Sequence, residues 1–333
     1  MNQSVVASSL RLPGLDGSNP LGFLAALGLL RLLDHRARLE ARQRPRLCWI
    51  DDGYWQPIVH EAGDVESVIA AVIEDKATWA EDPAFLLAYD ESGEELIDPR
   101  TAGGKITRDL KPKPAAMRLF LDGIAGKSEN EGLDREGWVA ARRSMDTASA
   151  YGSETIQDNN GNTKPLALHF TAGQQKFLEA AARLQKEVAE DDLREALLGP
   201  WTGASKLPNM SWDATMARIY ALRATDPSSE KRGSVPGADW LAFIALGLLL
   251  VTPRGRNLVT TGVRGGWKDS VFTWPLWTSP ASTQVVRCLL AIPRLARLPA
   301  EERAFRGLAV IFSAGITRSD QGGYGAFTPA RVE

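Results

Sequence analysis

Cysteine is scarce in this chain of 333 residues, which contains only Cys48 and Cys288. Two cysteines this far apart cannot form a disulfide-rich scaffold, and they form no CxxC metal-binding motif. Sparse cysteine is typical of proteins in a reducing compartment, so the sequence predicts a cytoplasmic location.

Long hydrophobic runs are also missing. The two most apolar stretches, residues 21–33 and 240–251, are shorter than the roughly 20 residues needed to cross a bilayer, and Arg31 interrupts the first. Residues 1–12 contain one arginine and no long apolar core, which is unlike a signal peptide. We therefore expect buried helices and no membrane partner.

Local signatures of catalysis are absent as well. The histidines His35, His60 and His169 are isolated from one another, and no HxH or HExxH spacing predicts zinc. The sequence has no GxxxxGK[ST] phosphate loop, no GxGxxG after a strand and no GxSxG elbow. These absences predict no catalytic residue, no metal and no cofactor. His169 beside Phe170 is favoured as a core histidine.

Acidic pairs need no such motif, and Asp51-Asp52 follows a predicted strand. Two carboxylates there could hold Mg²⁺, as in some nucleases. A turn before Gly53 is the favoured interpretation, because aspartate is common in turns.

The composition is that of an ordinary globular protein, with 44% hydrophobic and 24% charged residues. Net charge is −2 at pH 7, and an autonomous DNA-binding domain would usually be basic. The total charge therefore argues against strong binding of nucleic acid by the chain alone, although it does not exclude local basic patches.

Apolar periodicity predicts a mixed α/β (α+β) fold in two domains, residues 1–200 and a helix-rich 201–333, divided near the turn-rich segment 199–208. Thr171 is expected to cap one helix, and Trp274 and Trp277 to form a packed corner around Pro275. Helices are predicted over residues 21–33, 65–80, 172–190, 238–250 and 282–290; strands over 47–51 and 308–316; and loops over 90–116, 144–164 and 253–269.

The string ALGLL occurs twice, within residues 25–30 and 244–249. It could be a trace of duplicated halves. The favoured interpretation is that two buried helices with the same packing demand converged on it.

Three groups of basic residues could bind phosphates. Flexible basic loops can follow a nucleic-acid backbone, glycines let backbone amides approach it, and Trp267 could stack on a base. Solvated loops or helix-end charge clusters are the alternative. The candidate residues are Arg100, Lys105, Arg108, Lys111, Lys113 and Arg118, opposed only by Asp109; Arg142 and Arg143; and Arg254, Arg256, Arg264, Trp267 and Lys268.

Several short patches come in an order that resembles the large subunit of type I CRISPR effector complexes, most closely subtype I-G, formerly I-U. The resemblance extends from about residue 12 to about residue 325 without one diagnostic motif. The patches are residues 15–33 (LDGSNPLGFLAALGLLRLL), 169–178 (HFTAGQQKFL), 211–213 (SWD), 220–222 (YAL), 236–250 (PGADWLAFIALGLLL) and 272–290 (FTWPLWTSPASTQVVRCLL).

This resemblance implies a non-catalytic subunit whose partners are crRNA-bound CRISPR backbone subunits, target double-stranded DNA and a helicase-nuclease recruited in trans. Such a subunit would recognise the protospacer-adjacent motif in duplex DNA and support R-loop formation. In RNA-guided systems base pairing reads the sequence, and protein reads the flanking motif and the backbone. Two alternatives remain open: a purely structural assembly subunit, and a metal-dependent nuclease that uses Asp51 and Asp52.

Overall fold

A computed structural model describes residues 9–129, 132–171, 175–216, 233–318 and 324–333. The fold is mixed α/β, as predicted, with helices and several small sheets. The helices are α1 (Pro20–Leu39), α2 (Val65–Thr78), α3 (Pro99–Ala102), α4 (Pro114–Ser128), α5 (Arg135–Tyr151), α6 (Phe177–Glu187), α7 (Glu190–Leu198), α8 (Pro236–Ala245), α9 (Thr283–Leu290) and α10 (Ala300–Phe305).

Short 3₁₀ helices follow or precede several of these helices. The pairs formed by the described strands are all antiparallel. The 3₁₀ helices are η1 (Trp79–Glu81), η2 (Pro83–Phe85), η3 (Ala214–Met216), η4 (Leu246–Leu248) and η5 (Leu295–Arg297). The strands are β1 (Ser9–Arg11), β2 (Arg46–Asp51), β3 (Trp55–His60), β4 (Gly152–Gln157), β5 (Thr163–Pro165), β6 (Val251–Arg254), β7 (Asn257–Thr260), β8 (Val263–Arg264), β9 (Val271–Trp277), β10 (Leu308–Arg318), β11 (Gly325–Phe327) and β12 (Arg331–Val332).

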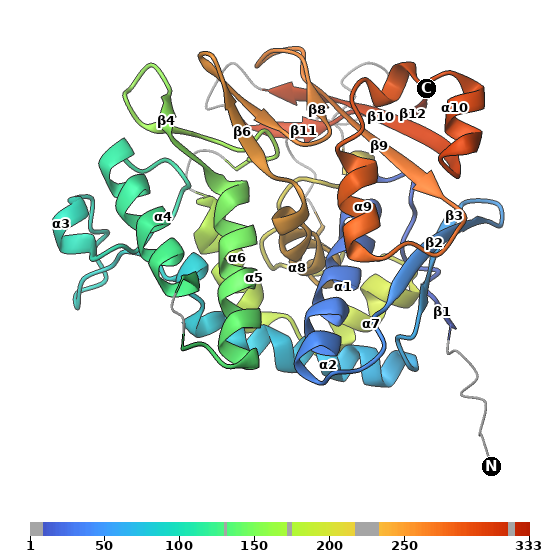
Figure 1. Cartoon of the computed structure of the whole chain (residues 1–333), viewed down its shortest axis with the longest axis horizontal. Coiled ribbons are helices and arrows are strands. Elements are labelled where there is room, and N and C mark those ends of the chain that lie inside the picture. The colour runs from blue at the N-terminus through green and yellow to red at the C-terminus, as the bar shows by residue number, and fades with distance from the viewer. Residues whose placement is uncertain (1–8, 130–131, 172–174, 217–232, 319–323) are drawn as a thin grey trace.

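Helices α1 and α8 lie side by side at the centre of the molecule (Figure 1). Asn19 caps α1 by accepting the backbone N–H of Leu21, and Pro20 occupies the first helical turn. Gly28 lets the two backbones approach, because a Cβ at this position would lie 1.7 Å from the carbonyl oxygen of Leu241. A pair of apolar helices in such close contact forms the centre of the hydrophobic core.

Two sheets and two hairpins surround this helical centre. The smaller sheet has the order β1-β3-β2, and the larger has β11-β10-β9-β8, with β12 also paired to β10. The hairpins are β4-β5 and β6-β7. In Figure 1 the larger sheet lies above α1 and α8, and α2 lies below them.

Buried tryptophans connect the sheets to α1. Phe23 stacks on Trp49 of β2 with ring centroids 5.9 Å apart, and it also contacts Trp274 of β9. The indole N–H of Trp277 donates to the carbonyl of Leu47 at 2.7 Å, and that of Trp274 donates to the carbonyl of Gly17 at 2.8 Å, so these two indoles gain both packing and a polar partner. Trp274 and Trp277 were expected to form a corner around Pro275, but they lie within the regular strand β9.

Residues 144–164 were expected to be a loop, and this expectation is wrong. Helix α5 continues to Tyr151, and the β4-β5 hairpin follows directly. Hydroxyl groups on this polar stretch are satisfied inside the helix, since Thr147 donates to the carbonyl of Arg143 and Ser149 to that of Met145. Polar residues of this kind can therefore occupy a helix without unpaired groups.

The expected helix over 172–190, capped by Thr171, begins later and is shorter. Residues 172–174 lie outside the described part of the chain, α6 begins at Phe177 after Lys176, and Thr171 is not its cap. Val188 has an extended conformation (φ −59°, ψ 125°), which ends α6 before α7 begins.

Residues 253–269 were expected to be a loop, but they contain the β6-β7 hairpin and β8. Asn257 pairs with Arg254 next to the turn, where Gly255 has φ of +61°. A glycine that tolerates positive φ is what a tight hairpin turn requires.

The division near residue 200 stays a prediction. Elements from both sides of it share one hydrophobic core, as the packing of α1 along α8 shows. Residues 201–333, expected to be rich in helices, also hold the larger sheet. Within the described residues, no helix is both long and apolar enough to span a membrane.

Candidate functional site

A groove lined by four arginines runs between the strands β6–β8 and the segment that follows α9. It has a volume of about 580 Å³, and we call it the basic groove. Arg254 and Arg264, both predicted from the sequence, come from the strands. Arg294 and Arg297 come from the opposite wall and were not predicted. No carboxylate side chain is among the groove's lining residues that the structure describes.

Three of these arginines have no acidic partner. Within the described chain, Arg254, Arg294 and Arg297 are exposed and lie in no ion pair. Arg264 contacts Glu333, with Nη2 3.3 Å from Oε1. A hydrogen bond from Ser313 and the charge of Arg264 lower the pKa of Glu333, so this carboxylate is ionised at neutral pH. The groove therefore carries a local excess of positive charge in a chain whose net charge is −2.

The segment around residues 100–118 has less free charge than the sequence indicated, because Asp109 is not its only acidic neighbour. Arg100 pairs with Asp98 at 2.8 Å, and Arg108 with Glu95 at 3.1 Å. Lys111 lies 3.8 Å from Asp109. Acidic residues outside residues 100–118 thus pair with two of the six predicted basic residues, and Asp109 within this range lies near a third. Lys105, Lys113 and Arg118 are exposed.

The β4-β5 hairpin brings this segment toward the β6-β7 hairpin. Lys113 donates to the carbonyl of Asn160 at the β4-β5 turn (3.3 Å), and Lys164 on β5 donates to the carbonyl of Arg256 at 3.5 Å. Two predicted basic segments, distant in sequence, therefore approach each other through a hairpin that was expected to be an irregular loop. Lys164 was missed for the same reason.

Trp267 is held in place by an arginine. The guanidinium carbon of Arg318 lies 3.8 Å from the centroid of the Trp267 ring, which is a close cation–π contact. Arg318 in turn donates to the carbonyls of His169 and Ala167, and burial lowers its pKa to about 10, which leaves it charged at neutral pH. Trp267 is still 58% exposed, so part of its ring is open to solvent while Arg318 holds the side chain in place. Lys268, next in sequence, is exposed.

Arg143 does not belong to a nucleic-acid surface, which corrects the prediction made for it. Its side chain is 8% exposed and its Nε donates to Asp82 at 2.8 Å, while Nη1 donates to Thr78. The guanidinium also lies 4.8 Å from the ring of Trp79. A buried arginine with these partners stabilises the fold and cannot reach a phosphate. Its neighbour Arg142 is 59% exposed and pairs with Asp146.

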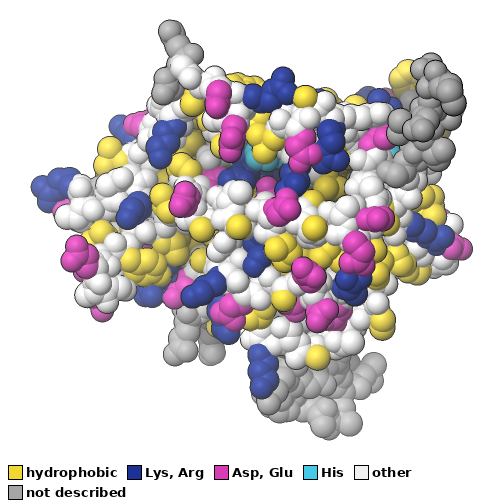
Figure 2. All heavy atoms as spheres, turned by 90° about the horizontal axis from the view of Figure 1, so that it is seen from below, with side chains coloured by type: hydrophobic (Ala, Val, Ile, Leu, Met, Phe, Trp, Pro, Cys, Tyr) yellow, Lys and Arg dark blue, Asp and Glu magenta, His cyan; other side chains and the backbone are white. Residues whose placement is uncertain are grey.

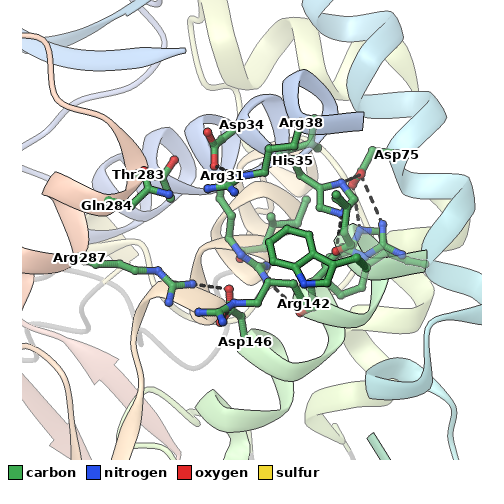
Figure 3. Close-up of a pocket in the computed structure, with 16 residues that line it drawn as sticks. Arg31, Asp34, His35, Arg38, Asp75, Arg142, Asp146, Thr283, Gln284 and Arg287 are labelled. Carbon is green, nitrogen blue, oxygen red and sulfur yellow. Dashed lines mark hydrogen bonds and ion pairs between the residues drawn. The ribbon is translucent and has the colours of Figure 1, made fainter. Parts of the chain in front are cut away.

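Arg142 and Arg143 instead line a second cavity, the Arg31 pocket, of about 260 Å³. Figure 3 shows Arg31 extending from α1 between Thr283 and Gln284 on one side and His35 and Asp75 on the other. Arg287 of α9 donates to Asp146 of α5 at 2.5 Å. The lining residues are Arg31, Leu32, Asp34, His35, Arg38, Asp75, Trp79, Trp138, Val139, Arg142, Arg143, Asp146, Ile244, Thr283, Gln284 and Arg287.

His169 is a core histidine, as expected. It is 2% exposed, and its Nε2 lies 3.1 Å from the carbonyl oxygen of Asp109. Burial lowers the pKa of His169, so the ring is neutral at pH 7. Asp51 is the exposed last residue of β2, and Asp52 lies in the exposed turn that follows, where it pairs with Arg11. Across the described ranges, no three His, Cys, Asp or Glu side chains are grouped to hold a metal ion.

Comparison of the chain with protein-family models, curated proteins and solved structures gives no significant match. The functional argument therefore depends on the chemistry of the basic groove and the Arg31 pocket.

Proposed function

We propose that the chain binds the phosphate backbone of nucleic acid through the basic groove, as a non-catalytic subunit of a larger RNA-guided complex. The observation that carries this proposal is the convergence of four arginines on one groove with no carboxylate in its described lining. Guanidinium groups present a fork of N–H donors that matches two phosphate oxygens. Because three of these arginines have no acidic partner among the described residues, their donors can bind a phosphate without breaking any of the ion pairs seen there.

The class of complex comes from the sequence. The resemblance to type I CRISPR large subunits, closest to subtype I-G, supports target duplex DNA as the ligand and crRNA-bound backbone subunits as the assembly partners. A helicase-nuclease recruited in trans would supply cleavage. A near-neutral net charge fits such a subunit, because partner subunits would share the task of binding the polyanion.

Further basic and aromatic groups would extend contact beyond the groove. Lys164 and Arg256 lie on the two adjoining hairpins, and Lys113, which precedes α4, contacts the turn of the first hairpin; all three could follow a backbone. Trp267 could stack on an unpaired base, since aromatic stacking is tolerant of sequence. Because the contact with Arg318 already restricts the Trp267 side chain, stacking on a base would cost less side-chain conformational entropy.

A structural assembly subunit is the second candidate. Phe305, in the short helix α10, is 92% exposed, and a large exposed aromatic is typical of protein contact surfaces. The face seen in Figure 2 mixes Lys and Arg with Asp and Glu, without one dominant sign. That face suits a protein partner better than a polyanion.

The groove hypothesis predicts the effect of the triple variant Arg254→Gln, Arg294→Gln, Arg297→Gln. Its affinity for a labelled DNA duplex should fall at least about tenfold, and the slope of log K against log salt should become shallower by about 0.9 for each phosphate contact removed. Fluorescence anisotropy across a salt series, on the chain or its assembled complex, measures both.

The matched control removes the same charge elsewhere, with Arg42→Gln, Arg183→Gln and Arg194→Gln. Each of these arginines is at least 40% exposed and pairs with a glutamate. The control should leave both affinity and slope near the wild-type values. An equal loss in the two triple variants would mean that only overall charge matters, which contradicts the groove.

The RNA-guided part of the proposal has its own test. Co-expression with chromosomally neighbouring genes should yield a complex that contains a discrete RNA of about 60 nucleotides, the order of size of a guide with its handles. A complex without RNA would contradict this part and favour the structural alternative. Duplex binding could survive that outcome, so the two parts can fail separately.

A further inference from the structure

Arg31 is a buried cation without an acidic partner. Its side chain lies on α1 facing the Arg31 pocket, the residue is 7% exposed, and no carboxylate of the described residues lies within 4.0 Å of its guanidinium. Burial lowers its pKa to about 10, so it is charged at neutral pH. A charge in this position is costly unless something compensates it.

Protein acceptors bind only some of the N–H groups of this guanidinium. Nη1 donates to the carbonyl of Ile244 at 2.8 Å, and Nη2 donates to the carbonyl of Arg143 and the hydroxyl of Thr147. A guanidinium has five N–H groups. Two of them, on Nε and Nη1, therefore have no acceptor within the described residues. Gly247 makes room for this arrangement, since a Cβ there would lie 2.4 Å from the guanidinium carbon.

Two more buried polar atoms of the pocket also have no partner. The hydroxyl of Thr283 has no hydrogen bond among the described residues, although the residue is 5% exposed. The Nδ1 atom of His35 likewise has no hydrogen bond among the described residues, although Oδ1 of Asp75 lies 3.9 Å from it. Because Nε2 of His35 is 3.2 Å from the carbonyl of Val139, it carries the proton, and Nδ1 is left as an acceptor. Burial lowers the pKa of His35 to about 3, so the ring is neutral.

We propose that the Arg31 pocket binds a small hydroxylated organic anion. The anionic group, a phosphate or a carboxylate, would accept the free N–H groups of Arg31 and the hydroxyl of Thr283. A ligand hydroxyl would donate to Nδ1 of His35 on the other side of Arg31 (Figure 3). This assignment does not depend on nucleic-acid binding by the basic groove.

Charge and size narrow the class of ligand. Five arginines and three aspartates line the pocket, and all three aspartates are already in ion pairs. Asp75 pairs with Arg143, Asp146 with Arg287, and Asp34 with Arg38 and Arg44. The lining is therefore positive overall. A volume of about 260 Å³ is below the range of roughly 300–1,000 Å³ that is usual for drug-sized ligands. A compound of a few carbon atoms with one anionic group matches both properties.

Isothermal titration calorimetry on the whole chain tests this with glycerol 3-phosphate, malate, inorganic phosphate and glycerol. Glycerol 3-phosphate represents the phosphate class and malate the carboxylate class, and at least one should bind at millimolar concentration or below. Inorganic phosphate should bind more weakly because it lacks the carbon-borne hydroxyl. Glycerol should not bind. A pocket filled by ordered water only would bind none of the probes, and that result overturns the proposal.

The variant Thr283→Val separates a ligand site from a structural cavity. Since the hydroxyl has no protein partner, its removal should leave the melting temperature of the free protein unchanged or higher. Affinity for the bound anion should nevertheless fall at least about tenfold. An unchanged affinity would overturn the assignment. Arg31→Gln should abolish binding, and Thr252→Val, on the exposed strand β6 outside the pocket, should change neither quantity.

Discussion

Replacing Gly28 by alanine is expected to lower the free energy of unfolding by about 3 kcal/mol or more. The added Cβ would lie 1.7 Å from the carbonyl oxygen of Leu241 and 3.2 Å from the backbone nitrogen of Ala245. Both atoms belong to the backbone of α8, so no side-chain rotation relieves the overlap. The two central helices would have to separate, and the core between them would lose contact.

The matched control is Gly123→Ala in α4, where a Cβ would meet nothing within 4 Å. Alanine is favoured over glycine in a helix by up to about 1 kcal/mol, so this variant should be slightly more stable than the wild type. Urea unfolding followed by circular dichroism measures both. Equal stability of Gly28→Ala and the wild type would show that α1 and α8 do not pack backbone to backbone.

The two copies of ALGLL illustrate what a sequence pattern can and cannot say. Both strings are buried, as predicted, but their glycines have different neighbours. Gly28 lets α1 approach α8, whereas Gly247 in η4 makes room for the guanidinium of Arg31. The two glycines thus meet different packing demands and not the single shared demand that was expected. The sequence alone does not distinguish a glycine at a helix–helix contact from a glycine that makes room for a buried arginine.

Strongly periodic elements were predicted well, and polar ones were not. The structure confirms α1, α9 and β10, because each has a clear apolar pattern. Helix α5 was not predicted, and its residues 144–151 were assigned to a loop, because much of its buried face is polar: Ser144 donates to Asp82, and Thr147 accepts from Arg31. Tertiary hydrogen bonds of this kind replace the hydrophobic contacts on which periodicity depends.

The candidate site could be predicted only in part for a similar reason. Arg254 and Arg264 were singled out because they occur among glycines. Arg294 and Arg297 follow a helix in an unremarkable stretch, and only the fold places them opposite the hairpin. Conversely, the acidic partners of Arg100 and Arg108 lie outside residues 100–118, the range in which the basic cluster was predicted. The charge of a surface patch depends on all the charged side chains that lie close together in space. Counting charged residues along the chain approximates it poorly.

Asp239 is expected to make stability fall as pH rises. It lies in the first turns of α8, is 1% exposed, and accepts the backbone N–H of Met210 at 3.0 Å. Burial, with a smaller contribution from the charge of Asp213, raises its pKa to about 8. The folded chain then keeps a proton that the unfolded chain has lost above about pH 4. Unfolding therefore releases a proton between these values, and the free energy of unfolding should fall by up to about 1.4 kcal/mol per pH unit.

Asp239→Asn tests this directly, because asparagine keeps the carbonyl that accepts from Met210 and has no proton to release. Its unfolding free energy, measured by urea denaturation from pH 5 to pH 8.5, should lose most of this slope and exceed that of the wild type at the alkaline end. The control Asp64→Asn changes the exposed cap of α2, where the hydrogen bond from Ser67 lowers the pKa of Asp64. A carboxylate of that kind contributes above its unfolded pKa and loses its contribution only in acid, so this control should keep the slope between pH 5 and 8.5. Parallel curves for the wild type and Asp239→Asn would mean that Asp239 is ionised in the folded chain, and that solvent or a cation reaches it.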